Sequence, residues 1–410
     1  MKFVKNWGRL GMTFETVSIG DVADVTKLAG FEFTKYIEYN ETGEIIALRA
    51  LNLRNGTLDL TDIKRIDQSV SEKLPRSKLY INDILLTYTG NGYGDCAIVE
   101  EDDKYHLAPN ICKIAPNPEK INPYFLYSVI RSSYFYQQMK NYIGGSSQPT
   151  IPMKTIRVLQ VPYPSIQTQN QIASILHGIN SKVVVNTAIN ENLGQQAQAI
   201  FKSWFVDKEN PDRKVCKADE YFDISIGKTP PRKEHEWFST KNTDIKWVSI
   251  SDMGSCGTFI SDSSEYLTQE AIDKFNVKVV PENTVLLSFK LTVGRITITT
   301  GKMATNEAIA HFKTKDDCIT EYLYCYLKNF NFQELGSTSS IATAVNSKII
   351  KGMPFIIPTD EEKRLFYSIA HQLFTEIRKN QAENQCLALL RDILLPKLMN
   401  GEIDVSEVKI

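Results

Sequence analysis

The chain has 410 residues, of which 42% are hydrophobic, 23% charged and 10% aromatic, values typical of ordinary globular domains and not of fibrous or disordered proteins. The 47 Lys and Arg residues balance 48 Asp and Glu residues, which excludes a uniformly basic surface but not a local basic groove. Seven cysteines without C-x-x-C spacing and only five histidines predict no metal site and a reducing, cytoplasmic location. No apolar run approaches the roughly 18 residues of a membrane span.

The first part of the chain predicts a domain of strands and short helices followed by one long helix. Alternating apolar segments bounded by turn residues predict strands at 45–48, 83–88 and 97–99. A helix is expected from Pro123 to Asn141. A much longer helix starts after Pro164, where Ser165 is a favourable N-cap. We expect the first domain at residues 1–160 and the first long helix at 161–208.

The second part of the chain repeats this order. Strands are expected at 247–250, 284–289 and 296–298. A helix is expected at 321–331, and a second long helix starts at the capping box formed by Thr359 and Glu362. We expect the second domain at residues 209–354 and the second long helix at 355–410.

The two halves also match in sequence. The segment Asp83–Val99 resembles Asn283–Thr299, and Gly94 matches Gly294 at an offset of 200 residues. One domain has therefore been duplicated. The predicted fold class is α+β: two copies of an α/β domain joined by two long helices that pack as an antiparallel coiled coil with pseudo-two-fold symmetry.

The long helices carry apolar residues that alternate by four and three, which is the pattern of a coiled-coil seam. The seam positions are Ile172, Leu176, Ile179, Val183, Asn186, Asn190, Leu193, Ala197, Ile200 and Trp204, and 194 residues later Phe366, Ala370, Leu373, Ile377, Asn380, Asn384, Leu387, Arg391, Leu394 and Leu398. Asn186, Asn190, Asn380 and Asn384 lie at the seam centres and are expected to fix the register of the pair. Pro396 is expected to kink or end the second helix. Two ordinary amphipathic core helices are the alternative.

Catalytic motifs are missing from the sequence. The string Asn122–Phe125 lacks the second proline of an adenine methyltransferase motif. The string Gly227–Thr229 resembles the end of a P-loop, but Phe222 stands where the first glycine belongs. Five scattered histidines form no recognisable triad. A recognition protein without catalytic residues and without a cofactor of its own is therefore expected.

Loops that mix basic, aromatic and amide side chains are the candidates for DNA contact, because these groups bind phosphates and base edges. In the first copy they are Arg76, Lys78, Tyr88, Asn91, Tyr93, Lys140, Ser146, Ser147 and Gln148. In the second copy they are Lys228, Arg232, Lys233, His235, Lys290, Thr292, Arg295, Ser339 and Ser340. The alternative for each residue is an ordinary turn or a solvated charge.

Three segments carry a family resemblance: VPYPSIQTQNQIASIL (161–176), GGSSQPTI (144–151) and LRDILLPKLMNGEI (390–403). Together with the duplication, they resemble the specificity subunit of a Type I restriction–modification system. The resemblance implies that each domain is a target recognition domain that binds one half of a bipartite double-stranded DNA site, and that the helices form an antiparallel spacer.

The resemblance also implies partners. Two methyltransferase subunits would bind the helical regions, and a restriction/translocase subunit would join the complex. S-adenosylmethionine, ATP and magnesium would belong to those subunits. Three alternatives stay open: a specificity subunit of a methylation-only complex, an enzyme with a divergent methyltransferase or nuclease site, and a coiled-coil spacer without a role on DNA.

Overall fold

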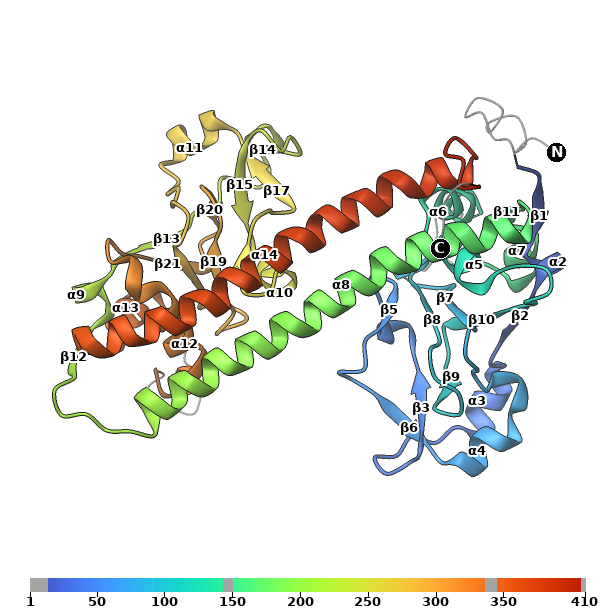
Figure 1. Cartoon of the computed structure of the whole chain (residues 1–410), viewed down its shortest axis with the longest axis horizontal. Helices are drawn as coiled ribbons and strands as arrows, with labels where there is room; N and C mark the ends of the chain where they lie inside the picture. The colour runs from blue at the N-terminus through green and yellow to red at the C-terminus, as the bar shows by residue number, and fades with distance from the viewer. Residues whose placement is uncertain (1–13, 91, 143–149, 336–344, 407–410) are drawn as a thin grey trace. The chain divides into compact units, whose positions relative to one another are not determined.

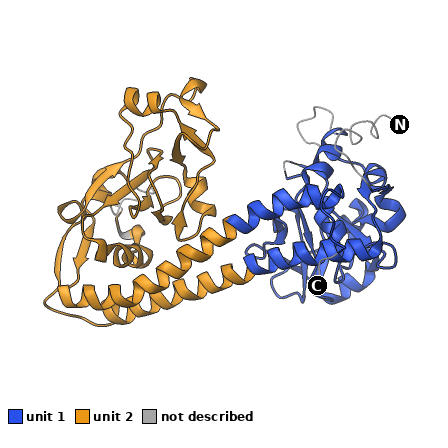
Figure 2. Cartoon of the chain, turned by 45° about the horizontal axis from the view of Figure 1, so that its top comes forward, with its two compact units in different colours: residues 1–183, 386–410 blue, residues 184–385 orange. Residues whose placement is uncertain are grey.

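The computed structural model describes residues 14–90, 92–142, 150–335 and 345–406, and Figure 1 labels their helices and strands. The chain forms two compact units, and Figure 2 colours them separately. Unit 1 comprises residues 1–183 and 386–410, and unit 2 comprises residues 184–385. Among the described residues, no helix is both long and apolar enough to cross a membrane.

Unit 1 is built on a four-stranded antiparallel sheet. Its strand order is β2 (Ala23–Lys27), β10 (Ile111–Pro116), β7 (Ile84–Thr87) and β8 (Cys96–Ile98) (Figure 1). A second sheet has the order β6 (Lys64–Ile66), β3 (Ile45–Leu48) and β9 (Tyr105–Leu107). Two small pairs are β1 (Thr16–Ser18) with β11 (Gln160–Pro162) and β4 (Leu53–Arg54) with β5 (Thr57–Leu58).

The α-helices that lie wholly within unit 1 are short. They are α2 (Ile19–Val22), α3 (Gly30–Tyr36), α4 (Gln68–Lys73), α5 (Pro123–Ile130), α6 (Ser133–Lys140) and α7 (Met153–Val158). The single helix expected over 123–141 is therefore two helices. The break occurs because Ser132 acts as a new N-cap, and its hydroxyl accepts a hydrogen bond from the Phe135 amide at 3.3 Å.

Unit 2 contains the same antiparallel order of four strands. They are β13 (Asp223–Ile226), β21 (Ile309–Lys313), β18 (Val285–Ser288) and β19 (Ile296–Thr299), and β16 (Phe259–Ile260) extends the sheet in parallel. The second sheet has the order β14 (Phe238–Ser239), β17 (Glu265–Leu267), β15 (Ile245–Val248) and β20 (Ala304–Thr305). The shared strand order confirms the duplication at the level of the fold.

The remaining elements of unit 2 surround these sheets. The strand β12 (Lys214–Lys217) pairs with β22 (Pro354–Ile357). The short helices are α9 (Ala218–Tyr221), α10 (Ile250–Ser255), α11 (Gln269–Phe275), α12 (Thr320–Asn329) and α13 (Ser347–Lys351).

The two long helices start where the sequence predicts. Helix α8 spans Ile166–Phe201, and the Ser165 hydroxyl accepts a hydrogen bond from the Thr168 amide at 3.2 Å. Helix α14 spans Asp360–Met399, and the capping box before it is formed: Thr359 accepts from the Glu362 amide at 3.3 Å, and Glu362 accepts from the Thr359 amide at 3.0 Å. Each helix begins in one unit and ends in the other.

The helices pair along the predicted seam, and none of its residues is exposed. Within unit 2, the Asn186 amide donates to Asn384 Oδ1 at 2.9 Å, and the Asn380 amide donates to Asn190 Oδ1 at 3.0 Å. A residue further along α8 therefore meets an earlier residue of α14, so the pair is antiparallel. Whether these asparagines control the register stays a prediction.

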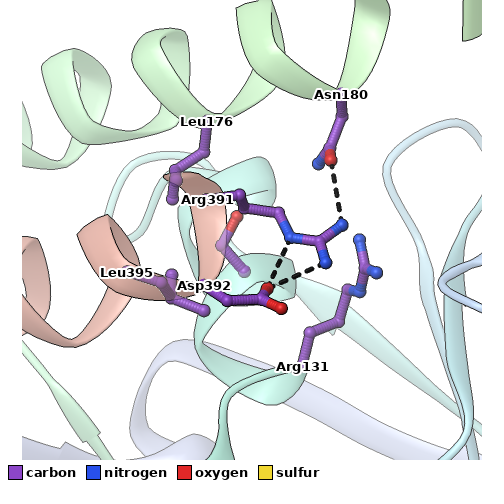
Figure 3. A pocket seen from close by; sticks show the side chains of 7 residues that line it. Arg131, Leu176, Asn180, Arg391, Asp392 and Leu395 are labelled. Carbon is purple, nitrogen blue, oxygen red and sulfur yellow. Dashed lines mark hydrogen bonds and ion pairs between the residues drawn. The ribbon is translucent and has the colours of Figure 1, made fainter. Parts of the chain in front are cut away.

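Arg391, which interrupts the apolar seam, is accommodated by polar partners within unit 1. Its guanidinium lies 2.8 Å from the Asp392 carboxylate and 3.4 Å from the Asn180 side-chain oxygen, beside a small cavity that Arg131, Leu176 and Leu395 also line (Figure 3). The positive charge of Arg391 is thus tolerated on the seam because its guanidinium donates to Asp392 and Asn180.

Pro396 is expected from the sequence to kink or end the second helix, and it does not end it, because α14 continues to Met399. Proline removes one helical hydrogen bond. Leu395, Leu398 and Met399 are all at least nine-tenths buried in the core of unit 1, and this burial offsets the loss.

Candidate nucleic-acid interface

The loop between β7 and β8 in unit 1, hairpin loop 1 (residues 88–95), is the first candidate surface. Gly90 and Gly94 adopt positive φ angles of 84° and 94°, which glycine accepts without strain. The Gly94 amide donates to the Thr87 carbonyl at 2.9 Å and closes the turn. A side chain at position 94 would meet the Tyr136 ring at 3.0 Å, so this glycine also permits a close contact.

Hairpin loop 1 meets two other predicted segments. The Tyr93 ring stacks on Tyr136 of α6 with a centroid distance of 5.4 Å, and the two hydroxyls lie 2.9 Å apart. The hydrogen bond with Tyr136 raises the pKa of Tyr93, so its hydroxyl stays neutral. The Thr89 and Thr150 hydroxyls lie 2.7 Å apart. Tyr136 belongs to α6, which ends at the exposed Lys140 before the glycine–serine sequence, and Thr150 follows that sequence. The hairpin therefore contacts both of the chain segments that flank it.

Tyr88 has a different environment from the other candidates. Its side chain is only 9% exposed in the core of unit 1, and the Lys27 ammonium lies 5.1 Å from its ring centroid. It anchors the base of the hairpin and leaves little surface for a nucleobase. Asn91, Ser146, Ser147 and Gln148 lie outside the described residues.

The basic stretch Arg76–Lys78 does not join hairpin loop 1. Arg76 is exposed, and Lys78 lies 3.5 Å from the Asp103 carboxylate. The Lys78 carbonyl accepts from the Lys113 ammonium at 2.7 Å. Lys113 also pairs at 3.7 Å with the buried Asp83, at the opposite end of β7 from the loop. The structure thus places this stretch and the hairpin loop on opposite ends of one strand.

In unit 2, the corresponding loop between β18 and β19 is hairpin loop 2 (residues 289–295). It is closed in the same way, because the Gly294 amide donates to the Ser288 carbonyl at 2.9 Å and Gly294 has a φ of 91°. A side chain at Gly294 would meet the Phe332 ring at 3.4 Å, as one at Gly94 would meet Tyr136. Lys290 and Thr292 are both exposed on this loop.

Two basic residues from separate segments, Lys290 and Arg232, act electrostatically on Glu307. Burial alone raises the pKa of Glu307, but a hydrogen bond from Thr229 and the positive charges of Lys290 and Arg232 lower it overall. Glu307 therefore stays ionised. Lys228 is exposed next to Thr229, and its ammonium donates to the Phe275 carbonyl at 2.7 Å.

Arg232 is held in place by aromatic rings. Its guanidinium lies 4.5 Å from the ring centroids of Phe238 and Trp247 and 2.8 Å from the Glu265 carboxylate. Lys233 and His235 are exposed on the same segment. A cation fixed over aromatic rings is a suitable phosphate contact, because little side-chain entropy remains to be lost on binding.

Arg295 is engaged inside unit 2. Its guanidinium donates to the Ile250 carbonyl at 2.6 Å and lies against Gly254, so it ties hairpin loop 2 to α10. This contact is intramolecular and does not require DNA. Ser339 and Ser340 lie outside the described residues.

Three residues of these surfaces were not singled out from the sequence: Tyr136, Glu307 and Leu291. Tyr136 and Glu307 are distant in sequence from the loops that they contact, so only the folded chain shows their role. Leu291 lies within a predicted loop, but nothing in the sequence indicates that its φ angle is positive.

Two copies of one sheet carry a closed hairpin loop each, with polar or basic side chains around it, and long helices pair beside them; this duplicated architecture suits a protein that recognises DNA sequence. The chain belongs to the family of the Type I restriction modification DNA specificity domain, whose model matches residues 12–195 and again residues 211–387. It is therefore a specificity subunit that recognises DNA sequence for a multisubunit restriction–modification enzyme and is not a catalytic subunit. Such a subunit functions in a complex with other restriction–modification subunits and DNA.

Several relatives carry matching names. The chain is 23% identical to the Type I restriction enzyme HindI specificity subunit of Haemophilus influenzae, over 94% of this chain and 98% of that one. It is 26% identical to the MjaIX specificity subunit of Methanocaldococcus jannaschii, over 69% of this chain and 70% of that one. The crystal structure of a Type I restriction–modification S subunit from M. genitalium is similar in fold, with a TM-score of 0.55 and 14% identity over 95% of this chain and 96% of that one.

Proposed function

We propose that each unit reads one half of a bipartite DNA site and that the paired helices set the gap between the half-sites. The observation that carries this proposal is the repetition of one hairpin with different side chains. Hairpin loop 1 presents Tyr93 stacked on Tyr136, whereas hairpin loop 2 presents the exposed Lys290 and Thr292. The same scaffold with different contact groups is suited to two different half-sites, because base identity is read by side chains in the grooves.

We further propose that the long helices bind two methyltransferase subunits and that a restriction/translocase subunit completes the complex. Apolar side chains at helical spacing support this proposal. On α8 within unit 2, Val185 and Ile189 are 52% and 41% exposed, and on α14 within unit 1, Leu389 and Ile393 are 64% and 58% exposed. Exposed apolar pairs of this kind are typical of protein interfaces. S-adenosylmethionine, ATP and magnesium would act on those partner subunits, in the cytoplasm.

Domain exchange tests the proposal. Residues 1–160 are replaced by the first domain of another specificity subunit, and the chimera is expressed with its methyltransferase partners. Sequencing of methylated adenines should then show one changed half-site, with the other half-site and the gap preserved. A change in both half-sites would contradict independent reading. Methylation by the purified chain without partners would favour the alternative of a divergent methyltransferase.

A further inference from the structure

Leu291 is exceptional within hairpin loop 2. Its side chain is 97% exposed, and its backbone has a φ of 60°, in the left-handed region. An L-residue with a Cβ pays a steric cost there, and a fully hydrated leucine side chain gains no burial energy. Within the free chain, neither the backbone nor the side chain of Leu291 is in a favourable state.

The fold itself does not require leucine at this position. In the part of the chain that the structure describes, every other non-glycine residue with positive φ is Asn or Asp. The corresponding loop in unit 1 has Gly90 with a φ of 84°, and a Cβ added there would meet no atom within 4 Å. Glycine or asparagine at 291 would therefore relieve the strain and keep the turn.

The surroundings of Leu291 indicate what would cover it. Its neighbours Lys290 and Thr292 are exposed, and the charges of Lys290 and Arg232 both act on Glu307. An exposed apolar side chain between a lysine and a threonine resembles the arrangement by which proteins place an aliphatic group in a DNA groove while basic neighbours bind phosphates.

We propose that Leu291 inserts into a groove of the half-site read by unit 2 and contacts an apolar surface of the bases there, either a thymine methyl group or an opened base-pair step. This inference rests on the proposed function, because it presupposes that unit 2 binds DNA. The left-handed backbone conformation at position 291 leaves the side chain exposed in the free protein, so the contact is preorganised.

The test uses the full chain purified with its methyltransferase partners. The wild-type complex first selects duplexes from a randomised library, and failure to select any sequence would refute the proposed function itself. The selected duplex is then titrated with complexes that carry Leu291→Gly or Leu291→Asn. Both variants should bind about 10- to 100-fold more weakly, with relaxed base preference in one half-site only. Their melting temperatures should be unchanged or higher, because the strain is relieved.

Val279→Asn is the matched control. Val279 is also an exposed aliphatic residue, but it precedes β18 and so lies at the opposite end of the hairpin from loop 2. This variant should bind DNA as the wild type does. Replacing single thymines of the affected half-site by deoxyuridine, which lacks the methyl group, separates the two contacts. If a replacement lowers the DNA affinity of the wild-type complex but not that of Leu291→Gly, Leu291 contacts that thymine methyl group. If no replacement lowers the affinity of the wild-type complex, Leu291 contacts the opened base-pair step.

Two results would overturn the inference. The first is that both Leu291 variants bind DNA with the same affinity and the same base preference as the wild type. The other is loss of a methyltransferase subunit from the variant complexes on size-exclusion chromatography, because Leu291 would then contact a protein partner.

Discussion

The contact between Arg213 and Glu362 shows how single residues fix the helix ends in unit 2. The Arg213 guanidinium lies 2.7 Å from the Glu362 carboxylate and donates to the Trp204 and Lys208 carbonyls at 2.6 and 2.9 Å. It therefore joins the segment that follows α8 to the first turn of α14. Burial alone raises the pKa of Glu362, but the hydrogen bonds from Arg213 and Asn210 lower it to about 2.

Glu362→Gln should destabilise unit 2 in a pH-dependent manner. The folded-state pKa of Glu362 lies below its ordinary value of 4.5, so its contribution is complete above pH 4.5 and is lost as the pH falls toward 2. The variant should be less stable than the wild type by roughly 2 kcal/mol at pH 7, and the difference should shrink below pH 4. Denaturant unfolding of both proteins at pH 7, 4 and 3 measures this difference in the free energy of unfolding.

The exposed neighbour Glu361 provides the control, because Glu361→Gln removes the same charge without a buried partner. Its stability should stay close to that of the wild type at every pH. A difference between wild type and Glu362→Gln that is constant from pH 7 to 3 would contradict the assigned ion pair.

At the scale of elements, the sequence predicts those features of the helices that depend on residues near one another in the chain. The seam spacing predicts both long helices, and Ser165 and Thr359 mark their starts. The break at Ser132 could not be predicted, because it depends on a competing cap. At Pro396 the sequence left both a kink and an end open, because the outcome depends on burial against residues distant in sequence. For the candidate site, the sequence predicts the hairpin loops but not which side chains are already engaged, as Arg295 is with the Ile250 carbonyl.

The asparagine pairs give a prediction for the helix pair as an element. Replacing only Asn186 by Leu leaves the Asn384 side chain without its partner amide, and this should cost about 1–3 kcal/mol. Replacing all four by Leu removes both ends of the Asn186–Asn384 and Asn380–Asn190 hydrogen bonds and buries more apolar area, so this variant should melt above the wild type. It should also form mixed oligomers, because the polar contacts that penalise a shifted register are gone.

Thermal melting combined with size-exclusion chromatography checks both variants, and Asn192→Leu, at an exposed position of α8, is the control. A single-site variant as stable as the wild type, or a quadruple variant that stays uniform in size, would show that these amides do not govern the register.

At the scale of the whole molecule, we propose that one pair of helices carries two DNA-reading units and determines the gap between their half-sites. Both α8 and α14 pass from one unit into the other, at Val183–Val184 and at Gln385–Cys386. The Asn186–Asn384 and Asn190–Asn380 pairs lie wholly within unit 2. The helices can therefore be lengthened near the boundary without disturbing these pairs.

Mapping of methylated adenines after such a lengthening tests this claim most directly. Seven residues are inserted between Val183 and Val184 and seven between Cys386 and Leu387, which keeps the seam in phase and adds about 10 Å to each helix. We expect both half-sites to be unchanged and the gap between them to grow by about three base pairs, at roughly 3.4 Å each. Methylation at the original gap by a correctly assembled complex would contradict the account.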